Sequence, residues 1–273
     1  MSSFLDEMVR ASAQRVAEAA RGESLDALAR RAAATPAAPP LRLSPTGFDV
    51  IAELKLRSPA AGVLRNAAHD VYARIAGYAR AGAAAVSVLT EPSRFDGSLE
   101  HLRQAAALLA PLGVPALRKD FLVDRYQVLE ARAAGAGGVL IILRMLRRER
   151  LEELLEVAAE QGLFVLLEAF DAADLELARD LLGESRSGTV LVGINSRDLA
   201  TLQVVPERFA ELAPRLPPGS IAVAESGVAS AADAVQVRRL GYRLALIGTA
   251  LMTCEDPAAR LAEILEAART LKS

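Results

Sequence analysis

Short apolar runs recur along the chain from residue 48 onward, and between them lie segments whose apolar residues are three and four positions apart. The runs are mostly continuous and rich in Val, Ile and Leu, which is typical of parallel strands covered on both faces. They are Phe48–Lys55, Ala84–Thr90, Val114–Lys119, Gly138–Leu143, Leu163–Glu168, Thr189–Asn195, Ile221–Glu225 and Leu244–Gly248. Eight strand–helix units over about 220 residues predict an α/β fold, a (β/α)8 TIM barrel.

The segments between the runs have helical patterns with typical ends. Glu149–Gln161, Ala172–Leu182 and Ala231–Leu240 are examples. Glycines suited to helix C-caps follow four such segments, at Gly82, Gly135, Gly162 and Gly241. The main alternative is an open, doubly wound sheet, which usually has a glycine-rich phosphate loop after its first strand. That strand here ends in Glu53-Leu54-Lys55, which favours the barrel.

The residues before the first run predict two helices and a connector. Ser2–Ala20 and Ser24–Ala33 have apolar residues at helical spacing, and Ser24 is a suitable N-cap. Ala34–Leu41 is rich in Pro and Ala and cannot continue a helix. We therefore expect one domain over residues 1–273, with an N-terminal helical extension and connector in 1–45 and the barrel in 46–273.

Composition narrows the classes of partner and cofactor. The 273 residues include 32 basic and 34 acidic ones, for a formal net charge of -2, which argues against a nucleic-acid partner. Cys254 is the one cysteine, so an internal disulfide and a Cys-rich metal site are excluded. The two histidines, His69 and His101, lack the spacing of metal ligands.

Targeting signals are absent from the sequence as given. The N-terminus has no basic segment followed by an apolar one, and no apolar run reaches the roughly 18 residues of a membrane span. We expect a cytoplasmic protein with no membrane partner, either a monomer or a weak homo-oligomer.

Lysine is rare in this chain. Three of the 32 basic residues are lysines, and the rest are arginines. Lys272 lies at the C-terminus, whereas Lys55 and Lys119 each end an apolar, strand-like run. Arginine keeps its proton near neutral pH, but a partly buried lysine can be tuned to release it. A salt bridge or chance would also explain two lysines, but the pattern favours positions that need an ammonium group.

Charged and polar residues gather where the predicted strands end. Active sites of barrels lie at the carboxyl ends of the strands. Those ends carry Glu53, Lys55, Glu91, Lys119, Asp120, Glu168, Asn195, Arg197 and Glu225. Glu91 or Asp120 alone is equally well explained as a solvated loop residue. Three carboxylates and two lysines at one mouth would shift one another's pKa values, as acid–base chemistry requires.

The last two strand ends have a different pattern. Glu225-Ser226-Gly227-Val228 leads toward a helix start at Ser230, and Ile247-Gly248-Thr249 runs into a short helical turn. Glycines let backbone N–H groups approach an anion, and the loops after strands seven and eight commonly hold phosphate in barrels. A phosphorylated small-molecule substrate is therefore expected.

Six motifs resemble the indole-3-glycerol phosphate synthase family. They are Ile51-Ala-Glu-Leu-Lys-Leu-Arg-Ser-Pro, Ser87-Val-Leu-Thr-Glu-Pro, Leu117-Arg-Lys-Asp-Phe, Gly193-Ile-Asn-Ser-Arg-Asp-Leu, Ala224-Glu-Ser-Gly-Val and Gly248-Thr-Ala-Leu-Met. They occur in order along nearly the whole chain. The resemblance implies conversion of 1-(2-carboxyphenylamino)-1-deoxyribulose 5-phosphate to indole-3-glycerol phosphate, CO2 and water, a step of tryptophan biosynthesis that needs neither a metal nor an organic cofactor.

The resemblance also implies roles for individual residues. The catalytic set would be Lys119, Glu168, Glu53, Lys55 and Asn195, with Lys119 as the general acid; the separate roles of Glu168, Glu53 and Lys55 stay open. The substrate would be bound by Ser58, Phe95, Phe121, Arg197 and Glu225, with the two phenylalanines beside its aromatic ring. Its phosphate would be held by Lys55, Ser226, Gly227, Gly248 and Thr249.

Two positions depart from the family's usual pattern. The first loop reads Ser58-Pro59-Ala60-Ala61-Gly62 where the family usually continues Ser-Pro-Ser, and Leu143-Arg144-Met145 has a charge where small or apolar residues are common. Three alternatives therefore remain: a paralogue with the same chemistry in a secondary pathway, a phosphate-binding barrel isomerase, and a non-catalytic barrel scaffold. The intact charged strand ends argue against the scaffold, because buried charge costs stability.

Overall fold

Eight parallel strands close into a barrel around the centre of the molecule, in the order β1-β10-β9-β8-β7-β6-β5-β4. The computed structural model describes residues 4–45, 47–58, 62–63, 68–183, 188–199 and 201–271, and only the backbone of residues 58, 63 and 68–70. The barrel strands are β1 (Asp49–Leu54), β4 (Ala85–Leu89), β5 (Ala116–Lys119), β6 (Gly138–Ile142), β7 (Phe164–Ala169), β8 (Val190–Asn195), β9 (Ile221–Glu225) and β10 (Leu244–Ile247). The predicted (β/α)8 barrel is confirmed.

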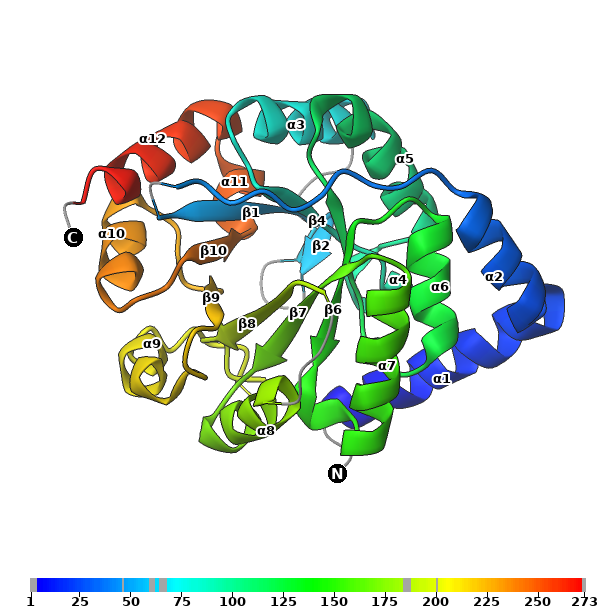
Figure 1. Ribbon diagram of the computed structural model, residues 1–273. Coiled ribbons are helices and arrows are strands. Elements are labelled where there is room, and N and C mark those ends of the chain that lie inside the picture. The colour runs from blue at the N-terminus through cyan, green and yellow to red at the C-terminus, as the bar shows by residue number, and fades with distance from the viewer. Residues whose placement is uncertain are drawn as a thin grey trace.

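Helices surround the barrel on its outside (Figure 1). Those that follow barrel strands or their loops are α3 (Ala68–Arg80), α4 (Pro92–Phe95), α5 (Leu99–Leu109), α6 (Arg125–Ala133), α7 (Arg148–Glu160), α8 (Ala172–Gly183), α9 (Glu207–Leu212), α10 (Ala231–Arg239), α11 (Thr249–Thr253) and α12 (Pro257–Arg269). Short 3-10 turns lie at η1 (Ala110–Leu112), η2 (Leu143–Met145) and η3 (Ala213–Arg215). All four predicted C-cap glycines have a positive φ, between 67° and 96°.

Burial on both faces explains why the strands read as continuous apolar runs. Along β1, Val50 and Ala52 pack toward the helices, whereas Ile51 belongs to a separate buried cluster inside the barrel. The same alternation along β7 places Leu166 inside the barrel and Val165 outside it. Side chains alternate in this way because successive residues of a strand point to opposite faces. An interior position near the end of a strand therefore projects into the mouth of the barrel.

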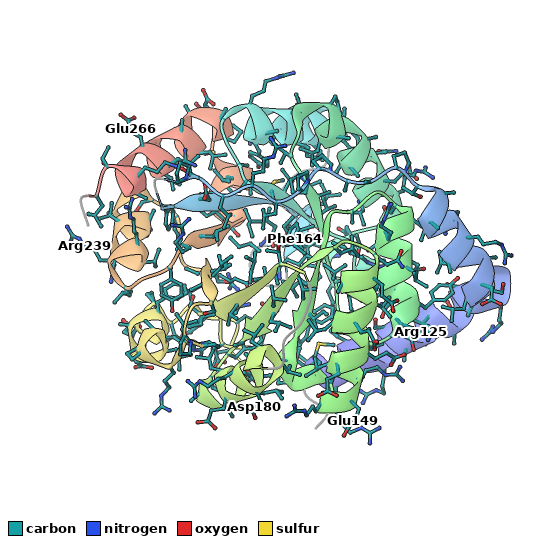
Figure 2. All side chains as sticks on the ribbon, viewed as in Figure 1. Arg125, Glu149, Phe164, Asp180, Arg239 and Glu266 are labelled. Atoms are coloured by element: carbon teal, nitrogen blue, oxygen red, sulfur yellow. The ribbon has the colours of Figure 1, made fainter. Side chains whose placement is uncertain are left out.

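Figure 2 shows this division between core and surface. Phe164 lies among the central side chains, and Arg125, Glu149, Asp180, Arg239 and Glu266 lie at the periphery on the surrounding helices. Gly138 on the neighbouring strand makes room for Phe164, because a Cβ at Gly138 would lie 2.5 Å from its ring. Within the part of the chain that the structure describes, no helix is both long and apolar enough to span a membrane.

The N-terminal extension forms α1 (Phe4–Gly22) and α2 (Leu25–Ala34), which lie beside α6 and α7 in Figure 1. Ser24 is the N-cap of α2, as predicted, and its side chain accepts a hydrogen bond from the Ala27 amide. Buried Leu28 and Ala32 of α2 pack against Tyr126 and Leu129 of α6. The two predicted helices are thus confirmed, with ends shifted by one or two residues.

A short antiparallel hairpin was not predicted from the sequence. Its strands are β2 (Arg57–Ser58) and β3 (Gly62–Val63), in the segment that follows β1. Each strand has two residues, which is too short for an alternating pattern to be recognised. The departures at Ala60 and Ala61 lie outside the described residues.

Candidate active site

A cavity of about 380 Å³ lies at the carboxyl ends of the barrel strands. Its polar lining includes Glu53, Lys55, Lys119, Asp120, Glu168, Asn195, Arg197, Glu225, Ser226 and Thr249. Strand parity accounts for much of this convergence. Glu53, Lys119 and Glu168 each follow an interior residue by two positions, after Ile51, Leu117 and Leu166 respectively, and therefore point into the mouth.

Lys119 and Glu168 face each other across this mouth. The Lys119 Nζ lies 3.9 Å from Glu168 Oε1, and the Glu168 side chain is 2% exposed. The Asn195 amide donates a hydrogen bond to the same Oε1 atom. Burial by itself lowers the pKa of Lys119, but the negative charges of Glu168, Glu225 and Glu53 outweigh burial and hold that pKa above its ordinary value. Lys119 is therefore a protonated ammonium at neutral pH.

Glu53 and Lys55 form a second ion pair two residues apart on β1 and its end. The Lys55 Nζ lies 2.8 Å from Glu53 Oε1. Burial by itself raises the pKa of Glu53, but the charges of Lys55 and Lys119 outweigh burial and bring that pKa below its ordinary value. Gly248 makes room for this carboxylate, because a Cβ at that position would lie 2.2 Å from Glu53 Oε1.

Glu225 is a buried carboxyl group that the described residues leave without a hydrogen-bond partner. Both its oxygens are unpaired within the described part of the chain, and the residue is 1% exposed. Burial, together with the negative charges of Glu168 and Glu53, raises the pKa of Glu225 well above its ordinary value, although Lys119 opposes the rise. Glu225 thus holds its proton where the other two glutamates of the mouth are paired with cations.

Two loops on the β9–β10 side bring backbone N–H groups to the cavity. Ser226 and Gly227 both adopt positive φ angles, of 64° and 78°, and the Ser196 hydroxyl donates to the Ser226 carbonyl at 3.1 Å. Gly248 is the N-cap residue of α11, with Thr249 as its first residue. The predicted helical turn after β10 and the predicted helix start at Ser230, the N-cap of α10, are both confirmed.

Arg197 enters the cavity from the loop after β8. Its backbone N–H donates to the Asn195 side-chain oxygen at 2.9 Å, and its guanidinium donates to the Leu202 carbonyl at 2.6 Å. Arg208 of α9 donates to the carbonyls of both Asn195 and Arg197, at 2.9 and 3.2 Å. The amide of Asn195 therefore links the Lys119–Glu168 pair to the loop that carries Arg197.

The opposite side of the cavity is apolar. Its lining there includes Phe4, Phe95, Phe121, Leu140, Ile142 and Phe170. The Phe95 and Phe121 ring centroids are 6.3 Å apart, and Phe4 of α1 packs edge-on against Phe121 at 5.8 Å. Offset and edge-on pairs of this kind leave ring faces for a further aromatic group.

The explanation of Glu91 and Asp120 as solvated loop residues is wrong. Glu91 is 1% exposed and caps α4 by accepting from the Ser93 and Arg94 amides. Asp120 is 3% exposed, and it pairs with Arg15 of α1 at 2.8 Å and with Arg118 at 3.2 Å. Burial by itself raises the pKa of Asp120, but the charges of the two arginines and their hydrogen bonds lower it to about 2.

The same arrangement has relatives among known proteins. A family model described as indole-3-glycerol phosphate synthase matches residues 5–264. The chain belongs to the indole-3-glycerol phosphate synthase family. It is 45% identical over 219 residues to the indole-3-glycerol phosphate synthase of Parafrankia sp., a match that covers 80% of this chain and 78% of that protein. With the indole-3-glycerol phosphate synthase of Streptomyces griseus it shares 39% identity, across 97% of this chain and 96% of that one.

Similarity to solved structures extends beyond the indole-3-glycerol phosphate synthase family. The crystal structure of 3-hexulose-6-phosphate synthase from Salmonella typhimurium superimposes with a TM-score of 0.63 at 13% identity, over 81% of this chain and 98% of that one. At such low identity the likeness shows the shared barrel fold alone.

The structure brings together nearly all the site residues that the sequence predicts from the indole-3-glycerol phosphate synthase family. Those that line the cavity are Glu53, Lys55, Phe95, Lys119, Phe121, Glu168, Asn195, Arg197, Glu225, Ser226, Gly227, Gly248 and Thr249. The exception is Ser58, whose side chain lies outside the described part of the chain. Their roles in binding and catalysis stay predictions. Among the described residues, no group of three or more His, Cys, Asp or Glu side chains is placed to hold a metal ion.

Sequence reasoning missed part of the apolar lining. Phe4 and Leu5 come from the N-terminal extension, and Phe170, Leu199 and Leu202 come from loops after strands. Phe170 could have been found, because it follows Glu168 by two positions and so shares its face. Phe4 could not have been found this way, because contact between α1 and the mouth depends on packing between distant parts of the chain.

Proposed function

We propose that this chain closes the indole ring of indole-3-glycerol phosphate. The substrate would be 1-(2-carboxyphenylamino)-1-deoxyribulose 5-phosphate, and the products indole-3-glycerol phosphate, CO2 and water, in tryptophan biosynthesis. One observation carries the proposal. The paired Lys119 and Glu168 lie in one cavity between an apolar wall with two stacked phenylalanines and two glycine-containing loops. A substrate with an aromatic ring at one end and a phosphate at the other matches both sides of this cavity.

Lys119 is suited to act as the general acid of the first step. The aromatic carbon that bears the carboxylate attacks the ribulose carbonyl carbon, a C–C bond forms, and the carbonyl oxygen takes a proton from the ammonium group. The Lys119 pKa lies above its ordinary value, which keeps the proton available at neutral pH. CO2 then leaves, and its bonding electrons restore the aromatic ring.

The glutamates are suited to the final loss of water. The new hydroxyl group must gain a proton to leave as water, and the neighbouring carbon must lose one. Glu168 and Glu53 lie on opposite sides of Lys119 in the mouth and would move these protons, with Lys55 beside Glu53 as a second cation for the substrate carboxylate. Asn195 and Arg197 would orient the ribulose hydroxyl groups.

The phosphate would be held by the loops after β9 and β10. Ser226 and Gly227 turn their backbone with positive φ, and Gly248 and Thr249 begin α11, whose free N–H groups favour an anion. On the other side, Phe95 and Phe121 would flank the carboxyphenyl ring. Lys55 would assist the phosphate only after it releases Glu53.

The proposal is tested by product fluorescence. The chain contains no tryptophan, so the indole of the product is detected against a dark protein background. We expect steady growth of indole fluorescence from purified protein and substrate, unaffected by a chelator. Lys119→Ala should lower kcat by about 100- to 10,000-fold, the usual contribution of a general acid, and change KM little. Substrate that binds but yields no indole fluorescence with the parent protein contradicts the proposal.

A further inference from the structure

A cation stands behind one wall of the cavity. Phe170 lines the cavity and is 6% exposed, and it follows Glu168 by two positions, so its side chain shares the interior face. The guanidinium carbon of Arg144 lies 4.8 Å from the centroid of the Phe170 ring. Arg144 belongs to η2, directly after β6. This is the charged residue at which the sequence departs from the family's usual pattern.

Two aspartates fix the guanidinium plane. Arg144 Nε donates to Asp174 Oδ2 at 2.9 Å, and Arg144 Nη2 donates to Asp171 Oδ2 at 2.5 Å. The Phe170 backbone N–H donates to the same Asp174 oxygen at 2.8 Å. Asp174 therefore holds both the backbone of Phe170 and the cation that covers its ring. A planar guanidinium makes this double contact with little loss of freedom, because its donors have a fixed geometry.

The charge of Arg144 does not enter the cavity as a free cation. Its donors point to the two aspartates, which lie at the start of α8, and the Arg144 side chain is 31% exposed on the outer side. Burial opposes the ionisation of Asp171, but the Asp174 N–H and Arg144 lower the pKa of Asp171 below its ordinary value. The cluster is thus ionic at neutral pH, and the cavity side of Phe170 remains apolar.

The position of Phe170 on the barrel indicates which end of the substrate it meets. Strand β7 neighbours β6, and β5 and β6 lie across the closed barrel from β9 and β10, which carry the glycine-containing loops. Phe170 belongs to the same buried apolar cluster as Phe121 and Ile142. Its ring therefore faces the apolar half of the cavity, away from the loops proposed for phosphate.

We propose that Phe170 is a specificity-determining residue for the carboxyphenyl ring of the substrate, and that Arg144 is the positioning residue that fixes the Phe170 ring. This inference rests on the proposed function. A ring held on its outer face by a cation, and on its backbone by Asp174, cannot rotate aside to admit a bulkier substrate. The wall formed by Phe170 then sets which substituents the substrate ring can carry.

The experiment compares substrates that carry one methyl group at each free position of the carboxyphenyl ring. We measure kcat and KM by indole fluorescence for the parent, Phe170→Ala, Phe170→Leu, Arg144→Met and Arg144→Lys. Arg260→Met is the matched control, because it removes an arginine from an exposed ion pair with Glu263 on α12, outside the cavity lining. Circular dichroism identifies any variant that does not fold, and Phe170→Leu keeps an apolar side chain at the position in case Phe170→Ala does not.

For the unsubstituted substrate, Phe170→Ala should raise KM by about tenfold, the low end for a lost apolar contact in a pocket. It should also raise the kcat/KM of at least one methylated substrate relative to the unsubstituted one, and Phe170→Leu should do so to a smaller extent. Arg144→Met should raise KM about threefold, as expected for one cation–π contact at a partly exposed site, and widen the range of accepted methyl groups. Arg144→Lys should restore part of this effect, and Arg260→Met should change neither quantity.

The order of preference among methylated substrates decides the outcome, because a merely structural role of Arg144 would lower activity without changing that order. An unchanged order in folded Phe170→Ala and Phe170→Leu overturns the inference for Phe170. An unchanged order in Arg144→Met overturns the positioning role alone. Failure of the proposed function is distinguishable, because the parent itself would then produce no indole from the unsubstituted substrate.

Discussion

Glu225 is the least satisfied charged side chain in the mouth of the barrel. Its oxygens have no hydrogen-bond partner among the described residues, whereas Glu168 accepts from Asn195 and Glu53 is paired with Lys55. An unpaired buried polar group typically costs about 1–3 kcal/mol of stability. Residues that lower stability in this way are often kept for function, and Glu225 lines the cavity proposed as the active site.

Replacement of Glu225 by glutamine should therefore stabilise the protein at high pH. The folded-state pKa of Glu225 is raised, so its contribution to stability is fully present below the unfolded pKa and is lost as pH rises through the folded pKa. Glu225→Gln cannot ionise and avoids this loss. We expect equal free energies of unfolding near pH 4 and a gain of about 1–2 kcal/mol for the variant at pH 8. Urea denaturation at the two pH values measures the difference.

The control for this prediction is Glu266→Gln, on the exposed face of α12 (Figure 2). This variant should differ from the parent by a constant amount at both pH values. A Glu225→Gln variant that loses stability as pH rises, as the parent does, would show that another group causes the pH dependence.

Gly193 on β8 leaves the space that the Glu225 carboxyl group fills. A Cβ at Gly193 would lie 1.9 Å from Glu225 Oε1, which is the end of a side chain and can move aside. Gly193→Ala should therefore fold but displace Glu225, and lower kcat/KM about as much as Glu225→Ala does. In the double variant the loss should be no greater than in either single one, because neighbours that act on one contact are not additive. Additive losses would contradict this coupling.

At the scale of elements, α1 is tied to the loop that carries Lys119. Arg15 donates to both carboxylate oxygens of Asp120, at 2.8 and 3.0 Å. The Ser12 hydroxyl donates to the Phe121 carbonyl, and Gln127 of α6 donates to Ser12 at 2.8 Å. These contacts support the prediction that the extension and the barrel form one domain, which remains a prediction.

Removal of the Arg15 side of this tie should destabilise the protein more than removal of a surface pair. Arg15→Met leaves Asp120 with Arg118 as its remaining cation, and Arg15 is itself partly exposed, so we expect a loss of about 1–2 kcal/mol. Arg31→Met, which breaks the exposed pair with Glu23, should cost less than about 1 kcal/mol. Equal losses in urea denaturation would mean that the Arg15–Asp120 pair contributes no more than a surface pair.

The elements of the barrel could be predicted because each has a strong local pattern. All eight apolar runs coincide with barrel strands, with ends that differ by one or two residues, as for Phe48–Lys55 and β1 (Asp49–Leu54). Strands buried on both faces are continuous apolar runs, and the charge that ends each run marks the mouth. The positions of Glu53, Lys119 and Glu168 in one cavity follow from that pattern and from barrel closure.

Contacts between elements could not be predicted in the same way. The tie between Arg15 and Asp120 joins residues more than a hundred positions apart, and no periodicity relates them. Arg144 stood out in the sequence as a charge in an apolar context, but its partners Asp171 and Asp174 became evident only from the packing of η2 against the start of α8.

At the scale of the whole molecule, barrel closure separates two chemically different sides of one cavity. Strands β5 and β6, with Phe121 and Ile142 at their ends, lie across the barrel from β9 and β10, with Ser226 and Gly248 at theirs. Lys119 and Glu168 lie between the apolar side and the glycine-containing loops. A substrate that reaches both sides must present its reacting atoms to these central groups, and orientation of this kind lowers a reaction barrier.

Two fragments of the proposed substrate should therefore bind at the same time. Inorganic phosphate would occupy the loops after β9 and β10, and anthranilate would occupy the apolar side beside Phe95 and Phe121. A ligand that binds only the folded state raises the melting temperature by mass action, so each fragment alone should raise it. Together they should raise it by about the sum of the two shifts, because separate sites contribute independently. A combined shift no larger than the greater single one would mean that the two fragments compete for one place in the cavity.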